Sequence, residues 1–264
     1  MASVMAKVTR TLPWRPTGGP APATEVRVTE IEVRRLRVFA DETGAAGSLL
    51  AVVLDAAKLL PDQRERAQIA RRLGVPATVF VDDLEQAELA VHTPDRQVPT
   101  AGDALVGAAW LIARLLGGHP AVLRLAGGDA VSWQDQGRVW TRAALTGVTG
   151  WTHRQVGSPA EVEQLTLPRP EQDDLVQVWA WLDEQAGVVR ARAFGERHGV
   201  AEDEACGSAS MLLAARLERR LTIRHGIGSI VLAGPGPEGF ADIGGLVVED
   251  ETLHIDHLDD FLAD

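Results

Sequence analysis

Short runs of β-branched and other apolar residues, separated by glycine-rich turns, recur along most of the chain. Such runs predict strands. Helical patterns fall between them without a regular alternation, so the order favours an α+β fold over a doubly wound sheet. The predicted strands cover 26–39, 49–55, 77–82, 87–93, 121–126, 130–134, 138–145, 174–182, 188–194, 221–226, 229–234 and 243–250.

Two helical patterns are apolar on nearly every side. One lies within 99–118, where the long apolar run is broken only by Arg114, and the other opens near Gly207 in "EDEACGSASMLLAARL". A helix without a polar face has to be buried all round, so each is predicted to lie at the centre of a module wrapped by strands. Other helices are predicted at 61–73 and at 158–165, the latter with Ser158 as its N-cap.

The residues that lead into the two apolar helices are similar. When "GDALVGAAWLIARL" is aligned with "EDEACGSASMLLAARL", Asp103 falls on Asp203 and Gly107 on Gly207, in each case 100 residues apart. We therefore expect two pseudo-symmetric modules whose helix N-termini face one cleft. Free N–H groups and the positive ends of two helices suit a carboxylate-bearing ligand. The alternative is that two core helices merely begin with similar turns.

The duplication also suggests how the chain is divided. We expect a first module over 25–118 and a second over 119–244, with the C-terminal strand in 245–264 free to return to the first. The preceding segment, 1–24, carries four prolines and scattered glycine and threonine, and is predicted to be a flexible tail.

Composition narrows the classes of partner. The net charge is −11 and the pI is about 5.1, and the chain lacks the basic stripe that would neutralise nucleic-acid phosphates. No apolar run reaches the ~18 residues of a membrane span. A single cysteine fits a reducing compartment, so we expect a cytoplasmic protein with a small-molecule ligand and neither a nucleic acid nor a membrane as partner.

Several motifs occur in the order of a known family. They are "RVFADETGAAGSLLAVVLD", "HTPDRQVPTAGDALVGAA", "VAEDEACGSASM" and a late Gly244–Gly245 pair. From about Val33 onward the chain thus resembles the phenazine-biosynthesis (PhzF-like) branch of the diaminopimelate epimerase superfamily. The resemblance implies two modules, each a strand barrel around a central helix, with a cleft between them. It also implies a cofactor-independent isomerase and a homodimer.

The functional residues of that family are retained unevenly. The glutamate that carries the proton in PhzF-like isomerases falls on Ala77, and the histidine of the family falls on Asp103. Ser48 stands where the family has an asparagine in the cleft. The aspartate and the Gly–Ser pair of the family are retained as Asp203, Gly207 and Ser208.

The segment before the second apolar helix instead resembles diaminopimelate epimerase itself. "ERHGVAEDEACGSA" follows the epimerase pattern "ERGxGETxACGTG" with one extra residue, and in that family the cysteine is a catalytic acid/base. The matching residue is Cys206, while the family's second cysteine falls on Ala101. A helix N-terminus lowers a thiol pKa toward thiolate, although the acidic neighbours oppose this.

The candidate site combines these residues. The expected catalytic groups are Cys206, Asp203 and Asp103, with helix capping as the alternative role of the two aspartates. Glu204, where the PhzF-like pattern has proline, is either a replacement base or a solvated carboxylate. No metal site or cofactor motif is expected, because the histidines lack ligand spacing. The expected substrate contacts are Gly102, Gly207, Ser208, Ala209, Ser48 and Glu204.

The expected activity is that of an isomerase with a relocated base. It would move a proton on a carboxylate-bearing small molecule derived from an amino acid, in specialised metabolism such as antibiotic biosynthesis. One alternative is an epimerase or racemase that uses Cys206 and Asp103. Others are a catalytically inactive binding protein of the same fold and a structural partner protein.

Overall fold

The computed structural model describes residues 30–148, 150–166, 175–195 and 200–256, together with 258 and 261. The predicted tail, 1–24, lies outside the described residues. The helices are α1 (Ala56–Leu59), α2 (Gln63–Leu73), α3 (Gly102–Leu116), α4 (Pro159–Glu163) and α5 (Gly207–Leu217), with a 3₁₀ turn at Leu145–Gly147. The strands are β1 (Ile31–Ala40), β2 (Ser48–Val53), β3 (Ala77–Asp83), β4 (Glu88–His92), β5 (Gln97–Val98), β6 (Val122–Leu125), β7 (Ala130–Asp135), β8 (Arg138–Ala144), β9 (Trp151–Gln155), β10 (Leu175–Asp183), β11 (Val188–Gly195), β12 (Val200–Asp203), β13 (Leu221–His225), β14 (Ser229–Pro235) and β15 (Phe240–Ile255).

Eight strands close into a barrel around α3. They pair in the order β1, β2, β3, β4, β6, β7, β8 and β15, and β15 returns to β1. The interior of the barrel and the buried face of α3 belong to one apolar cluster. This explains why the helix sequence has no polar face over most of its length. Helices α1 and α2 cover the outer face of the same barrel, over a second cluster that includes Ile69 and Phe80.

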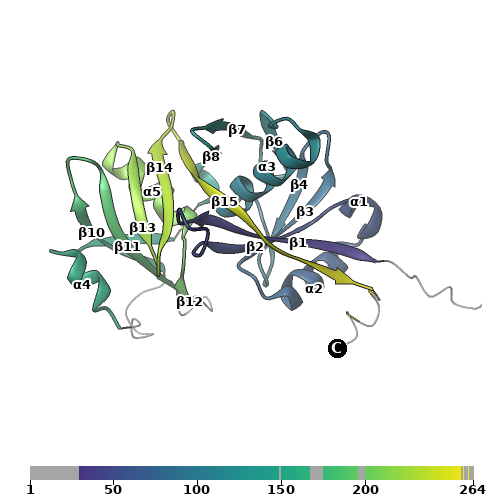
Figure 1. Ribbon diagram of the computed structural model, residues 1–264, viewed down its shortest axis with the longest axis horizontal. Coiled ribbons are helices and arrows are strands. Elements are labelled where there is room, and N and C mark those ends of the chain that lie inside the picture. Colours follow the sequence, from purple (N-terminus) through teal and green to yellow (C-terminus); the bar gives the residue numbers. More distant parts are fainter. Residues whose placement is uncertain are drawn as a thin grey trace, which may run out of the picture.

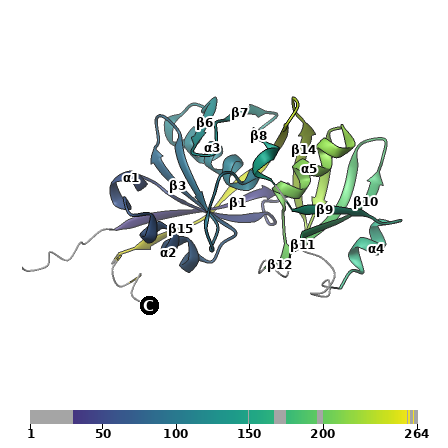
Figure 2. The ribbon, with the colours of Figure 1, turned by 180° about the vertical axis from the view of Figure 1, so that it is seen from behind.

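A second group of strands surrounds α5. Here β15, β14, β13, β11, β10 and β9 pair in that order, and Figure 2 shows β9 and β10 beside α5 with α4 at the far end of this group. The pairing types repeat those of the first group. Two pairings in each group are parallel: β2–β3 and β4–β6 in the first group correspond to β9–β10 and β11–β13 in the second. Three are antiparallel: β3–β4, β6–β7 and β7–β8 correspond to β10–β11, β13–β14 and β14–β15.

The repeat differs from the alignment made on sequence. Helix α3 begins at Gly102 after Ala101 as N-cap, and α5 begins at Gly207 after Cys206 as N-cap. The structural offset at the helix start is therefore 105 residues, and the predicted correspondence of Asp103 with Asp203 is wrong. Asp103 lies inside the first turn of its helix, whereas Asp203 ends the strand before the turn. Both segments contain an aspartate four positions before a glycine. Matching these residues gives the wrong register.

Strand β15 connects the two groups of strands. Its first part pairs with β8 and β14, and its second part pairs with β1 from Leu246 to Ile255. Figure 1 shows this strand, in yellow, crossing from one group to the other. Strands β6 to β8 belong with α3 in the closed barrel, so the first module extends beyond the expected boundary at Gly118. The chain passes to the second group after β8.

Several local features agree with the sequence patterns. Ser158 caps α4 by accepting a hydrogen bond from the Glu161 amide (3.3 Å), as predicted. Strand β9 was not predicted, because "WTHRQ" at the edge of the sheet lacks a clear apolar alternation. Among the described residues, no helix is long and apolar enough to cross a membrane.

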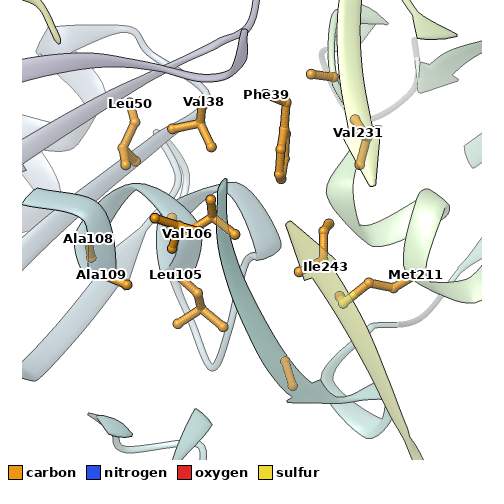
Figure 3. Packing of buried hydrophobic residues seen from close by; sticks show 14 of the residues in the cluster. Val38, Phe39, Leu50, Leu105, Val106, Ala108, Ala109, Met211, Val231 and Ile243 are labelled. Carbon is orange, nitrogen blue, oxygen red and sulfur yellow. The ribbon is translucent and has the colours of Figure 1, made fainter. Parts of the chain in front are cut away.

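Buried side chains from both modules meet in the middle of the molecule. Figure 3 shows Phe39 between Val38 and Val231, and Ile243 between α3 and Met211. Phe39 has φ of 65°, the left-handed region that bulky residues rarely adopt. It interrupts the β1–β15 register between Val38 and Ala40. The strand continues after this irregularity to Ala40, which pairs with Leu246 of β15 before the loop that leads to Ser48.

Candidate functional site

The N-termini of α3 and α5 meet at one point, here called the helix junction (101–103 and 203–209). A Cβ on Gly207 would lie 3.4 Å from the Gly102 Cα and 2.9 Å from the Ile243 Cδ1, and one on Gly102 would lie 3.0 Å from the same Cδ1. The absence of side chains at both positions lets the two helix ends approach this closely. The junction thus brings together the first turns and the positive ends of two helices, with the Ala104 amide bonded to the Asp103 carboxylate and the Ala209 amide to the Cys206 sulfur.

Asp103 brings a carboxylate from α3 to the junction. Ser48, buried at the start of β2, donates a hydrogen bond to its Oδ2 (3.3 Å). Asp103 lies deep in the protein but keeps part of its surface accessible. Burial raises the pKa of this carboxyl group, although the Ala104 amide and Ser48 oppose the rise.

Asp203 brings a second carboxylate from the other module. It ends β12, and its Oδ1 accepts a hydrogen bond from the Ala205 amide (3.1 Å). Burial, and then the charge of Asp103, raise its pKa from 3.8 to about 6. The junction therefore holds two carboxyl groups whose pKa values are both raised, in each case mainly by burial. Near neutral pH the pair supplies both a proton acceptor and, to a smaller extent, a proton donor.

Cys206 lies beside this pair but is not a thiolate. It is 2 % exposed and packs with Ala193, Ala209 and Trp151. Burial and the Asp203 charge raise its pKa well above 9.0. The expectation of a lowered thiol pKa is therefore wrong, because burial and the two carboxylates outweigh the helix end. The neutral thiol donates a hydrogen bond to Asp203, which lowers the pKa of that carboxyl group.

The Glu204 carboxylate is held by hydrogen bonds from the start of β14 and the turn before it. Its Oε1 accepts from the Ser229 hydroxyl (2.7 Å), and both oxygens accept from the Ile227 amide (2.8 and 2.9 Å). These donors lie in the β13–β14 turn, so the carboxylate is engaged by the turn. A Cβ on Gly226 would lie 1.9 Å from Glu204 Oε2, which explains the glycine there.

The remaining residues predicted to contact the substrate differ in solvent exposure. Ser208 is half-buried in the first turn of α5, at the position that corresponds to Asp103 in α3. Ala209 is fully buried, and its carbonyl lies 2.8 Å from the His153 ring Nε2. Ala77 is buried in the barrel core, opposite Leu50 of β2. The place of the PhzF-like glutamate is therefore apolar here. Glu196 and Arg197 of the epimerase-like motif lie outside the described residues.

A buried polar pair behind the junction was missed on sequence. His225 and Gln177 are both fully buried inside the second module, with 3.3 Å between their side-chain nitrogens. Burial and the Arg190 charge lower the His225 pKa to about 4, so the ring is neutral. It donates from Nδ1 to the Glu204 carbonyl (3.1 Å) and accepts from Gln177. The alternation in "LTIRH" places His225 on the inner face with Leu221 and Ile223, and this signal would have found it.

Comparison with known proteins identifies the class of fold. No family model matches the chain. Solved structures of PhzF-family proteins and of epimerases with the diaminopimelate epimerase fold share its architecture over about 86 % of its length. At identities of 12 to 21 %, these likenesses establish the fold.

Three of these structures illustrate the range. A PhzF-family phenazine biosynthesis protein from Enterococcus faecalis aligns with a TM-score of 0.69 and 18 % identity, over 86 % of this chain and 99 % of the other. A predicted epimerase from Pseudomonas aeruginosa gives 0.62 and 21 %, over 85 % and 99 %. A hydroxyproline epimerase from Agrobacterium vitis with bound trans-4-hydroxy-L-proline gives 0.52 and 12 %, over 86 % and 92 %.

Proposed function

We propose that this protein is a cofactor-independent isomerase that moves a proton on a carboxylate-bearing small molecule derived from an amino acid. The observation that carries the proposal is the presence of two carboxyl groups with raised pKa values, Asp103 and Asp203, where two helix N-termini meet. The substrate would lie in a cleft between the modules. The fold is shared with isomerases and epimerases, which supports the reaction class.

In this mechanism the carboxyl pair is the relocated base. The ionised member removes a proton from a carbon beside a carbonyl, carboxylate or imine group. The protonated member returns a proton elsewhere on the same conjugated ligand. Backbone N–H groups of Gly102, Gly207 and Ser208 would hold the ligand carboxylate and stabilise the enolate-like charge, because the Ala209 amide is already bonded to the Cys206 sulfur. Cys206 would act through its hydrogen bond to Asp203 and not as the base.

The second candidate is an epimerase or racemase. The hydroxyproline epimerase with the same fold favours it, and the same carboxyl pair could act from opposite sides of one carbon. The version that uses Cys206 and Asp103 would need the thiol to ionise, and its raised pKa weighs against that. The third candidate function is that of a small-molecule-binding protein without catalytic turnover.

The test is proton exchange with solvent. The protein is incubated in D₂O with a panel of cyclic and unsaturated amino acids, and mass spectrometry and NMR locate the deuterium. Deuterium at a new carbon indicates isomerisation, and deuterium at an inverted stereocentre indicates epimerisation. We expect Asp203→Asn and Asp103→Asn each to slow exchange by about 10²–10⁴-fold, while Asp129→Asn, which removes an exposed carboxylate, leaves it unchanged.

Two results would contradict the proposal. Exchange that survives in both aspartate variants would place the base elsewhere. Ligand binding without any deuterium incorporation would favour the binding protein. The homodimer, the cytoplasmic location and the role in specialised metabolism rest on the resemblance and the composition, and we include them as part of the proposal. Sedimentation velocity tests the dimer.

A further inference from the structure

A loop of the first module lies against a turn of the second. In the loop 41–47, the Asp41 carboxylate accepts hydrogen bonds from the Thr43 amide (2.9 Å), the Thr43 hydroxyl (2.7 Å) and the Ala45 amide (3.0 Å). A Cβ on Gly228 would lie 3.5 Å from the Ala46 Cβ and 3.8 Å from Asp41 Oδ2. The loop is thus ordered by its own side chains and packs directly on the β13–β14 turn.

Hydrogen bonds connect the two segments through one carboxylate. The Gly47 amide donates to the Ser229 hydroxyl oxygen (2.9 Å), and Ser229 donates in turn to Glu204 Oε1 (2.7 Å). The Ile227 amide fixes the same carboxylate from the turn. Ser229 is fully buried, so its hydroxyl group is shielded from water, whereas the bonds from the Ile227 amide are exposed. We call the chain of Gly47, Ser229, Glu204 and Ile227 the inter-module clamp.

The clamp is connected to both carboxyl groups, to Asp103 by a hydrogen bond from Ser48 and to Asp203 along the chain. Ser48, which follows Gly47, donates to Asp103, and Glu204 directly follows Asp203. A movement between Gly47 and Glu204 therefore changes the separation of Asp103 and Asp203. We propose that Glu204 is a positioning residue, which joins the modules through Ser229 and holds the two aspartates at the spacing that the proposed reaction needs. This inference rests on the proposed function.

The surroundings of the clamp support a role beyond ordinary packing. Glu204 adds a third carboxylate near Asp203 and Asp103 and contributes to the raised pKa of Asp203, which an apolar residue would avoid. The backbone is also constrained on the first-module side. Gly47 has φ of 117°, and a Cβ there would lie 2.8 Å from the Val38 carbonyl oxygen. The left-handed Phe39 adds local strain, of the kind that accumulates at functional sites.

The test compares two buried serines and needs no substrate. Ser229→Ala removes the link between Gly47 and Glu204, and Glu204→Gln keeps the volume but weakens the acceptor. Ser132→Ala is the control, because Ser132 is also buried and hydrogen-bonded, to His119 in the first module (2.7 Å). Amide hydrogen exchange measures how well the Gly47 N–H group is protected from solvent. Carbon-detected NMR reports the titration of Asp203, whose charged or titratable neighbours are Asp103, Glu204 and Cys206.

We expect Ser229→Ala to speed exchange of the Gly47 amide by about tenfold and to lower the titration midpoint of Asp203, since water enters and Asp103 moves away. Glu204→Gln should change both in the same direction by less, and Ser132→Ala should change neither. Unchanged exchange and titration in Ser229→Ala would overturn the inference. If Ser229→Ala shifts both the exchange rate and the Asp203 midpoint, but the wild-type protein incorporates no deuterium, the clamp is supported and the proposed reaction is rejected.

Discussion

The two modules have the same order of strand pairings but enclose their central helices differently. Helix α3 lies inside a closed barrel of eight strands, whereas six of the described strands surround α5 and β9 ends that sheet. Helix α3 carries Gly107 and Ala108 where α5 has Leu212 and Leu213, whereas the buried Leu105 of α3 stands where α5 has Ser210. The comparison shows that a repeated backbone topology sets different packing requirements on each copy.

The helix starts differ in chemistry as well. The N-cap is Ala101 in α3 and Cys206 in α5, and the residue after the first glycine is Asp103 in one and Ser208 in the other. The second module supplies its carboxylate from β12 instead. Each module therefore contributes one acid to the junction, but from a different element. The following predictions test how far this asymmetry matters, from the largest expected effect to the smallest.

Asp203→Asn should stabilise the protein at neutral pH. Folding raises the Asp203 pKa from 3.8 to about 6, so the folded state binds the proton more tightly than the unfolded chain does. The wild type therefore loses stability as the pH rises from about 4 to 6, by on the order of 3 kcal/mol in total. Asp203→Asn lacks this pH-dependent loss of stability. The free energy of unfolding of the variant and of the wild type is measured by urea denaturation at pH 4 and at pH 8. An equal difference between variant and wild type at both pH values would contradict the shift.

Gly107→Ala should destabilise the closed barrel. The new Cβ would lie 2.3 Å from Leu50 Cδ2 and 2.9 Å from Val38 Cγ2, and overpacking of this kind costs about 1–3 kcal/mol. The better helix propensity of alanine offsets about 1 kcal/mol of that. Gly118→Ala is the control, because nothing lies within 4 Å of its Cβ position. Equal denaturation midpoints for the two variants would mean that the barrel adapts freely around α3.

Cys206→Ala makes the two helix starts alike and should have the smallest effect on turnover, less than about tenfold. The thiol is protonated and buried, so iodoacetamide should label it only on unfolding. Loss of its hydrogen bond should move the titration midpoint of Asp203 upward, because that bond lowers the Asp203 pKa. Abolished turnover in this variant would restore the thiol as the catalytic base.

Much of the fold could be predicted from the chain, since alternation and apolar runs depend on neighbouring residues. The run at 77–82 became β3, and the helix apolar on all sides at 99–118 became α3. The site was harder, because its properties arise from contacts between distant segments. The partners of Glu204 lie 23 and 25 residues away. The thiol pKa depends on Asp103, which lies on another module, and no local motif carries that information.

The long strand β15 also affects how the protein can be made. Because β1 pairs with residues up to Ile255, the barrel that starts at the N-terminal end of the described chain cannot close until Ile255 has left the ribosome. The first module therefore waits for the second during synthesis, and its unpaired strands stay exposed in the meantime. Contacts so distant in sequence slow folding and favour aggregation. Deletion of the last part of β15 should open the first barrel while most of the pairings of the second remain.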